Sequence, residues 1–370
     1  MKIIITANAA WNISHFRRPI VEALIQEGHE VVALSPKDSS VAELEAMRVR
    51  HIPLRMDSNG INPIKDAGLL RDFRKIFLAE APKVILSFTI KNNIYGALAV
   101  KSLAIPFLSN VSGLGTVFLK AGWLDWIATW LYRSAFRNLN YVIFQNADDR
   151  EMFVDRKIIS GAQGLLVPGS GIDLARFRPA ESEAQSESAT TFLLIARMLW
   201  DKGVIEYVEA ARKVKEDFPQ ARFQLLGACG VENRTAIARS TVDQWVDQGT
   251  VEYLGEMPDV RPIINAADCV VLPSYREGAP RVLLEASAMA KPVIATDVPG
   301  CRDVVDHGVT GILCKVRSVD SLAEAIRNFL TMPKNKRSVM GQAGRQKMEK
   351  EFNQDIVVEI YRNAIRDVVS

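Results

Sequence analysis

Two glutamates form the pattern in this chain that most clearly suggests chemistry. Glu277 lies in a polar loop after the apolar run 270–272, and Glu285 lies eight residues later in an apolar segment predicted to be helical. A carboxylate on a buried helix is costly unless it is paired or accepts hydrogen bonds. Since a helix N-terminus at the carboxyl end of a strand attracts anions, we interpret Glu285 as the acceptor for two hydroxyls of a ribose whose phosphate binds there. Glu277 would face the group beyond the phosphates. The alternative for Glu285 is a structural anchor paired with a neighbouring arginine.

Two cations in the second half of the chain complement these carboxylates. Arg197 directly follows the strand predicted at 192–196, and Lys202 lies five residues further along. A guanidinium offers a bidentate fork to a diphosphate, and an ammonium adds a point charge beside it. Two surface cations are the alternative. Leu254, at the end of another predicted strand, marks a loop where a doubly wound domain could hold a base.

The start of the chain argues against a nicotinamide dehydrogenase. The turn after the first predicted strand, ANAAWNIS, contains Asn12 but none of the glycines that a dinucleotide-binding turn needs. His15, Arg17 and Arg18 begin a helix predicted over 15–27, where the helix dipole favours an anionic ligand. A solvated helical face is the alternative interpretation.

Further candidates follow the middle strands of the first half. Lys91 lies just past the strand predicted at 84–88, at the edge where open α/β sheets bind ligands. A simple surface lysine is the alternative. The segment NVSGLGTVF contains Gly113, Gly115 and Thr116, and its glycines let the backbone approach a ligand closely.

Tryptophans gather on one face of the next predicted helix, beside basic residues. The apolar face comprises Leu119, Trp123, Trp126 and Trp130, flanked by Lys120, Arg133 and Arg137. Such a face indicates either a core helix or a helix that lies at a membrane interface.

Composition indicates a globular two-domain protein. The chain has 370 residues, more than one hydrophobic core usually serves, with 48% hydrophobic and 24% charged residues. No apolar run approaches a membrane span, the N-terminus reads as a strand and not as a signal peptide, and the four cysteines lack metal-ligand spacing. We therefore expect reduced thiols in a cytoplasmic protein.

Charge is distributed unevenly along the chain. Residues 1–168 carry 20 basic against 15 acidic residues, and residues 169–370 carry 26 against 28. A mildly basic first half suits a phosphate-bearing substrate, but it falls well short of a nucleic-acid footprint.

Strands and helices alternate in both halves, which predicts an α/β fold. We place the first domain at residues 1–172, a linker at 173–190 and the second domain at 191–353. The low-complexity stretch AESEAQSESAT supports the linker. The amphipathic helix predicted at 354–370 is of a kind that packs back on the first domain.

Six segments together resemble family 4 retaining glycosyltransferases across essentially the whole chain: NISHFRRPI, SFTIKNNIYGALA, VSGLGTVF, ARMLWDKGV, YLGEMPDV and LPSYREGAPRVLLEA. The resemblance implies the GT-B fold, in which two Rossmann-like doubly wound domains face a central cleft. The chain is most similar to capsule, O-antigen and glycan transferases that extend undecaprenyl-diphosphate-linked sugars, particularly those that add N-acetylgalactosamine.

The resemblance assigns roles to the candidates. Arg197 and Lys202 would hold the donor diphosphate, Glu285 the ribose, and Glu277 the donor sugar as the catalytic residue. The remaining donor-site residues would be Leu254, Ser274, Gly278, Ala279, Arg281 and Val282. The acceptor site would comprise Asn12, His15, Arg17, Arg18, Lys91, Gly113, Gly115 and Thr116. The chain has no D-x-D motif, which agrees with a metal-independent mechanism without a cofactor.

One feature departs from the family pattern. Several members carry a catalytic histidine where this chain has NVSGLGTVF. A diphosphate oxygen can take the acceptor proton instead, so no general base is assigned, and His15 is the histidine nearest the expected cleft.

The function implied is transfer of a hexose or N-acetylhexosamine, with N-acetylgalactosamine favoured, from a UDP-sugar to an undecaprenyl-diphosphate-linked saccharide at the inner face of the cytoplasmic membrane. A non-hydrolysing UDP-sugar epimerase of the same fold and a non-catalytic nucleotide-sugar-binding protein are the alternatives. No nucleic-acid partner is expected.

Overall fold

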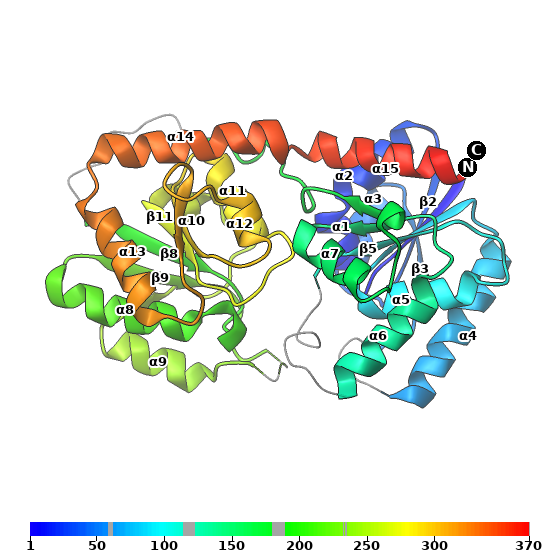
Figure 1. The fold of residues 1–370 in the computed structure, drawn as a ribbon, viewed down its shortest axis with the longest axis horizontal. Helices are drawn as coiled ribbons and strands as arrows, with labels where there is room; N and C mark the ends of the chain where they lie inside the picture. Colours follow the sequence, from blue (N-terminus) through cyan, green and yellow to red (C-terminus); the bar gives the residue numbers. More distant parts are fainter. Residues whose placement is uncertain (58–61, 114–122, 180–188, 232, 234, 370) are drawn as a thin grey trace. The chain divides into compact units, whose positions relative to one another are not determined.

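The computed structural model describes residues 1–57, 62–113, 123–179, 189–231, 233 and 235–369. The chain divides into two compact units (Figure 1). The first unit comprises Met1–Ser170 and Gln354–Ser370, and the second comprises Gly171–Asn353. The C-terminal segment therefore returns to the first unit after the second is complete.

The first unit is built on a parallel sheet with the strand order β3-β2-β1-β4-β5-β6-β7. Its strands are β1 (Lys2–Thr6), β2 (Glu30–Ser35), β3 (Arg50–Pro53), β4 (Val84–Phe88), β5 (Phe107–Val111), β6 (Val142–Phe144) and β7 (Gly164–Leu166). Its helices are α1 (Ala10–Phe16), α2 (Arg18–Gln26), α3 (Val41–Ala46), α4 (Pro63–Glu80), α5 (Ile90–Val100), α6 (Trp123–Phe136), α7 (Ala147–Asp155) and α15 (Gln354–Val369). The central strands are continuous apolar runs because both faces of a parallel sheet are covered.

The two faces of this sheet carry separate cores. Successive residues of a strand point to opposite faces, so Ile3 and Ile5 pack with residues of α1, α2 and α15. Ile4 packs on the other face with residues of α4, α5, α6 and α7.

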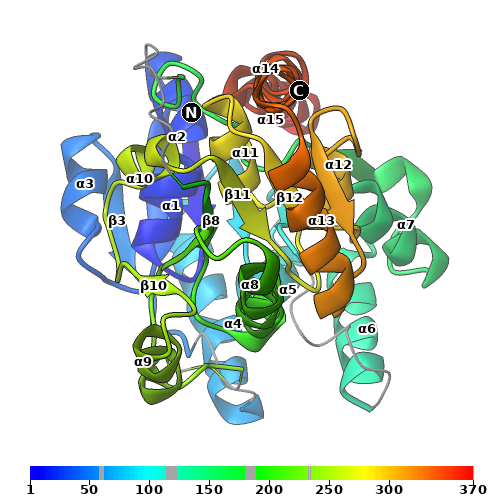
Figure 2. The ribbon, with the colours of Figure 1, turned by 90° about the vertical axis from the view of Figure 1, so that its left-hand side faces the viewer.

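The second unit repeats this plan, with the strand order β10-β9-β8-β11-β12-β13. Its strands are β8 (Thr191–Ile195), β9 (Arg222–Leu226), β10 (Glu252–Tyr253), β11 (Cys269–Leu272), β12 (Val293–Thr296) and β13 (Gly311–Cys314). Its helices are α8 (Val204–Asp217), α9 (Arg239–Asp247), α10 (Arg261–Ala266), α11 (Arg281–Ala288), α12 (Cys301–Val304), α13 (Val319–Thr331) and α14 (Lys334–Glu351). Figure 2 shows this unit in front, with α8 and α13 on one side of its sheet and α10, α11 and α14 on the other.

The order of both sheets confirms the predicted α/β class with two Rossmann-like units. The first helix differs from its prediction. Instead of one helix over 15–27, α1 ends at Phe16 and α2 begins at Arg18, with Arg17 between them at φ −111° and ψ 3°. Pro19 explains the break, because a residue without an N–H is suited to a helix start and not to an interior. Asn12 consequently lies on a helix and not in a turn, and His15 lies in the last turn of α1 and not at the start of a helix.

The start of the predicted linker is packed structure. Leu174 and Phe177 contribute to a core of the second unit, and so does Ile172, which the predicted boundary places at the end of the first domain. The low-complexity part, 180–188, lies outside the described residues.

Helix α15 is held in the first unit by a buried polar contact. The Tyr361 side chain is 2% exposed, and its hydroxyl accepts a hydrogen bond of 2.7 Å from Asn110 Nδ2 on β5. The same ring lies 6.0 Å from that of Phe88, centroid to centroid. Burial raises the pKa of Tyr361 above its ordinary value, so the phenol stays neutral and able to accept.

Replacing Tyr361 by Phe removes the partner of a buried amide donor, which costs about 1–3 kcal/mol. We expect the Y361F protein to lose about that much free energy of unfolding in urea titrations. Y141F is the matched control, because the Tyr141 hydroxyl donates to Asp367 at the exposed surface. Its loss should change the stability by less than about 0.5 kcal/mol. Equal losses in both variants would contradict the role of burial.

Candidate active site

The candidate site lies at the carboxyl ends of the strands of the second unit. Parallel strands end at one edge, and β8 and β11 are direct neighbours, with Val270 opposite Leu193. The segment that follows β8 and the loop 273–280 that follows β11 therefore leave the sheet side by side. This is the edge at which open α/β sheets bind their ligands.

Lys202 and Glu277 meet at this edge. Lys202 ends a 3-10 turn, η3 (Trp200–Lys202), and its Nζ lies 2.5 Å from Glu277 Oε1. Their side chains are 22% and 14% exposed, so solvent screens the pair only in part. Gly203 makes the approach of the two segments possible, because a Cβ there would lie 2.1 Å from the Pro273 carbonyl oxygen.

Glu285 lies one turn into α11, with a side chain 12% exposed. Arg281 Nε donates to Glu285 Oε1 over 2.8 Å, so the carboxylate has the arginine partner that a structural anchor needs. Burial raises the pKa of Glu285 above its ordinary value, and the Arg281 charge opposes that rise. The helix starts at Arg281, and Pro280, its N-cap, has the extended ψ of 108°.

Arg197 follows β8 and is exposed. Its side chain makes no hydrogen bond or ion pair with any residue that the structure describes. Within the described residues the guanidinium of Arg197 is therefore unpaired, whereas Lys202, five residues further along the same segment, is paired. An anionic group bound at this edge has a ready bidentate donor.

The other predicted donor-site residues line the same edge. Ser274 is fully buried, and its Oγ has no hydrogen-bond partner within the described chain. Gly278 is buried, and Ala279 and Val282 are half-buried. Leu254 is half-buried after β10, with its N–H bonded to the Leu225 carbonyl at 2.8 Å.

Tyr275 is a residue of this site that sequence reasoning missed. Its hydroxyl donates to Glu206 Oε1 of α8 over 2.6 Å, and its N–H donates to the Asp201 carbonyl over 2.9 Å. Arg317 lies over its ring at 4.6 Å from the centroid. Burial raises the pKa of Tyr275 to about 12. Tyr275 therefore joins the loop of Glu277 to the segment of Lys202. Its position in the sequence PSYREG, two residues before Glu277, is the feature of the sequence that could have identified it.

Among the predicted acceptor-site residues, Arg17 and Lys91 contact residues that are distant in the sequence. Arg17 is 3% exposed, and its guanidinium lies 4.2 Å from the centroid of the Phe88 ring. Lys91 Nζ lies 2.8 Å from Asp66 Oδ1, and that carboxylate also accepts from the Tyr95 hydroxyl over 3.0 Å. The interpretation of Arg17 as part of a solvated helical face is therefore wrong. The interpretation of Lys91 as a simple surface lysine is wrong as well.

The remaining acceptor-site candidates lie on or after the first helices. His15 is half-exposed, 3.1 Å from Ser14 Oγ through Nδ1, and Arg18 pairs with Glu22 at 2.8 Å. Asn12 Nδ2 donates to Asn8 Oδ1 over 3.3 Å. Gly113 has a φ of 144°, which favours glycine. Gly115 and Thr116 lie outside the described residues.

Two consecutive Rossmann-like α/β units are the architecture of GT-B proteins, and a family model matches each of them. A model described as glycosyl transferase 4-like domain matches residues 13–168, and one described as glycosyl transferases group 1 matches residues 178–347. The chain therefore belongs to the glycosyltransferases that combine these two domains. The resemblance inferred from the sequence is confirmed.

Named relatives and solved structures are similar over most of the chain. An N,N'-diacetylbacillosaminyl-diphospho-undecaprenol alpha-1,3-N-acetylgalactosaminyltransferase of Campylobacter jejuni is 28% identical, over 98% of this chain and 97% of its own. A UDP-Gal:alpha-D-GlcNAc-diphosphoundecaprenol alpha-1,3-galactosyltransferase of Escherichia coli is 24% identical, over 72% and 71%. A glycosyltransferase of Rickettsia africae has the same fold, with a TM-score of 0.81, 18% identity and coverage of 100% and 98%. HepE of Anabaena, solved with UDP-glucose, has a TM-score of 0.82, 16% identity and coverage of 99% and 100%.

Gly300 offers a test of how the Glu277 loop is held. Its φ is +81°, and an added Cβ would lie 2.5 Å from the Gly278 carbonyl oxygen and 2.7 Å from that of Glu277. G300A should therefore push this loop away and weaken UDP binding at least tenfold in calorimetry. The matched control is G308A, whose φ is +77° but whose Cβ meets nothing within 4 Å. Both variants bear the backbone strain of about 1 kcal/mol, so equal UDP affinities would refute the loop argument.

Proposed function

We propose that this protein is a retaining glycosyltransferase that moves a hexose or N-acetylhexosamine from a UDP-sugar to an undecaprenyl-diphosphate-linked saccharide. N-acetylgalactosamine is the favoured donor sugar. The observation that carries the proposal is the close contact between Lys202 and Glu277 at the sheet edge where Arg197, unpaired within the described residues, follows β8. The two named bacterial transferases, whose acceptors are diphosphoundecaprenol sugars, support the acceptor class.

In the proposed mechanism the cations act on the leaving group. Arg197 binds the donor diphosphate, and Lys202 exchanges the Glu277 carboxylate for a diphosphate oxygen. Negative charge develops on that oxygen as the sugar departs, and preorganised cations stabilise it most in a partly desolvated site. The freed Glu277 then faces the donor sugar, and Glu285 accepts from the ribose hydroxyls.

Proton transfer in this scheme needs no protein base. As the bond between the sugar and the diphosphate breaks, the acceptor hydroxyl forms the new bond on the same face. A leaving diphosphate oxygen takes the hydroxyl proton. The site thus supplies charge and position, and the residues named suffice without a metal ion or a cofactor.

The first experiment is a donor screen. Purified protein is incubated with UDP- and GDP-sugars and a lipid-diphosphate saccharide, and nucleotide release is followed. Acceptor-dependent release with a UDP-N-acetylhexosamine supports the proposal. Release without an acceptor, together with interconversion of the sugar, would favour the epimerase. UDP binding with no turnover on any pair would favour a binding protein.

Neutralising Glu285 should have opposite effects on activity and on stability. A raised carboxyl pKa means that the folded state binds the proton more tightly than the unfolded state does. The protonated carboxyl therefore contributes to the free energy of unfolding at low pH. This contribution is lost as the pH rises through the raised pKa. E285Q should therefore remove transfer activity at neutral pH while keeping or raising the unfolding free energy by up to about 1 kcal/mol.

The control for E285Q is E349Q, which breaks another Arg–Glu pair spaced four residues apart on a helix. Arg345 Nε lies 2.6 Å from Glu349, whose side chain is 50% exposed. E349Q should leave both turnover and pH dependence unchanged. Full activity of a folded E285Q enzyme would remove Glu285 from the donor site.

We also propose that the protein associates with the membrane surface through α6. Tyr132 and Phe136 bury the inner face of this helix, whereas Trp126 and Trp130 are 69% and 57% exposed. The core interpretation is therefore wrong for these two tryptophans. The side chain of Trp123 and residues 119 and 120 lie outside the described part. No helix in that part is both long and apolar enough to cross a bilayer.

The membrane proposal predicts the effect of removing the exposed rings. Since insertion of an aromatic side chain contributes about 1.5–3 kcal/mol, W126S/W130S should bind phosphatidylglycerol vesicles at least tenfold more weakly in sedimentation. W200S is the control, because Trp200 of the second unit is also 57% exposed. The same loss in W200S, or none in the double variant, contradicts the assignment to α6.

A further inference from the structure

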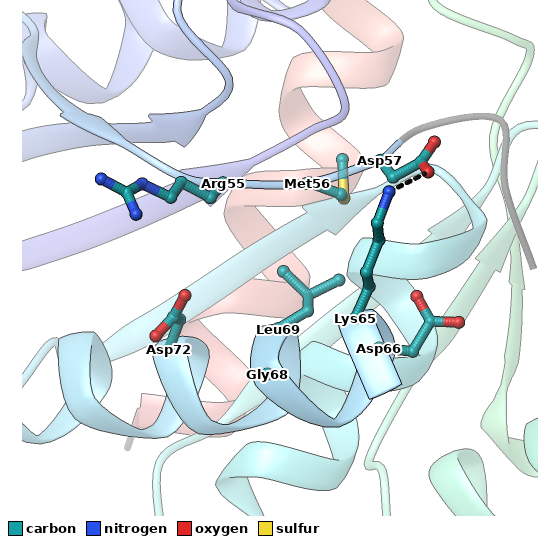
Figure 3. A pocket seen from close by; sticks show the side chains of 8 residues that line it. All are labelled: Arg55, Met56, Asp57, Lys65, Asp66, Gly68, Leu69 and Asp72. Carbon is teal, nitrogen blue, oxygen red and sulfur yellow. Dashed lines mark hydrogen bonds and ion pairs between the residues drawn. The ribbon is translucent and has the colours of Figure 1, made fainter. Parts of the chain in front are cut away.

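A hollow in the first unit has the properties of a ligand site. It lies between the segment after β3 and the first half of α4 and has a volume of about 340 Å³ (Figure 3). Ligand pockets generally measure about 300–1,000 Å³. The lining residues are Arg55, Met56, Asp57, Lys65, Asp66, Gly68, Leu69 and Asp72. The hollow therefore opens beyond the carboxyl end of a parallel strand, where such sheets bind ligands.

The two ends of the hollow differ in how their charges are used. At one end, Lys65 Nζ lies 3.3 Å from Asp57 Oδ2, and Asp66 is held by Lys91. At the other end lie Arg55 and Asp72 (Figure 3). Neither side chain pairs with another residue in the described part of the chain. A donor and an acceptor of hydrogen bonds thus remain available in the same hollow.

The hollow is kept open by a glycine within a helix. Gly68 lies in the interior of α4, where glycine costs roughly 0.5–1 kcal/mol relative to alanine. A Cβ added there would meet no atom within 4 Å. Leu69 points from the same helix toward the segment after β3 that carries Met56, which gives the hollow an apolar floor (Figure 3). The glycine leaves room that no other described side chain fills.

The charges define the class of ligand. Counting Lys91, three cations accompany three carboxylates, so the hollow has no excess positive charge to attract phosphate or another anion. A hydroxyl both donates and accepts, and can therefore satisfy Asp72 and Arg55 together. The apolar floor suits the C–H face of a sugar ring.

We infer that this hollow is a subsite for an uncharged sugar residue of the acceptor saccharide, with Arg55 and Asp72 as specificity-determining residues. The inference rests on the proposed function and identifies the part of the acceptor that the first unit recognises. Lys91 follows β4 at the centre of the sheet and pairs with Asp66 in the lining. This pair connects the subsite to the carboxyl end of β4. An uncharged hexose or N-acetylhexosamine fits the subsite, and the balanced charges of the subsite give no net attraction for a uronic acid.

The test measures saccharide binding directly and does not require turnover. Saturation-transfer NMR with the methyl glycosides of N-acetylglucosamine, N-acetylgalactosamine and glucuronic acid is recorded on the wild type, D72N and G68L. Leucine at position 68 fills the hollow and favours the helix. Binding of at least one neutral glycoside should weaken about tenfold in D72N and disappear in G68L. Ala67→Leu, an exposed neighbour outside the lining, is the matched control.

The outcomes separate this inference from the proposed function. Unchanged neutral-sugar binding in G68L, absence of binding in the wild type, or preference for glucuronic acid overturns the subsite. UDP binding, measured in parallel, should be equal in all four proteins because the donor-site residues belong to the second unit. If the wild type transfers sugar and G68L keeps the same KM for the acceptor, the subsite alone is wrong. If the neutral glycoside binds as expected but no donor supports transfer, the proposed function alone is wrong.

Discussion

Desolvation of a single carboxylate is the constraint on which the second unit depends. Glu285 occupies a helix whose neighbours Leu283, Leu284 and Ala286 are completely buried, so its charge must be compensated locally. Arg281, one turn earlier, supplies part of that compensation and fixes the side chain toward the strand ends. An apolar residue would pack better at this position. The desolvation of the Glu285 carboxylate lowers stability at the edge of the sheet where a hydrogen-bonding ligand can offset this loss.

A second constraint is steric and acts on the backbone of the same site. The segments after β8, β11 and β12 converge so closely that glycines are required at Gly203 and Gly300. Lys202 and Glu277 adjoin these glycines, and their contact is a consequence of the convergence. Tyr275 then fixes the two segments relative to each other through Glu206. Charge and packing therefore specify one arrangement, which is the condition for a preorganised site.

Much of this organisation could be predicted because it is encoded locally. Apolar runs ending in polar loops located the strand ends, and so placed Arg197 and Glu277 on one edge before any contact was known. The partners of buried polar groups could not be predicted, because pairing between distant segments leaves no periodic signal. Tyr275 and Glu206 are 69 residues apart, and Lys91 and Asp66 are 25 apart. The burial of Arg17 against Phe88 escaped prediction for a related reason, since a guanidinium is ordinarily assigned to the surface.

The return of α15 to the first unit has a consequence for biosynthesis. Most of the first unit is synthesised before the second unit, but the helix that covers one face of its sheet is synthesised after the second unit. At roughly 5–20 residues per second, the whole second unit is translated during an interval of roughly ten to forty seconds. Throughout that interval the surface that α15 will cover, including Phe88, stays open. The nascent chain therefore exposes a defined apolar face for that time, and the first unit can be completed only after the second has been synthesised.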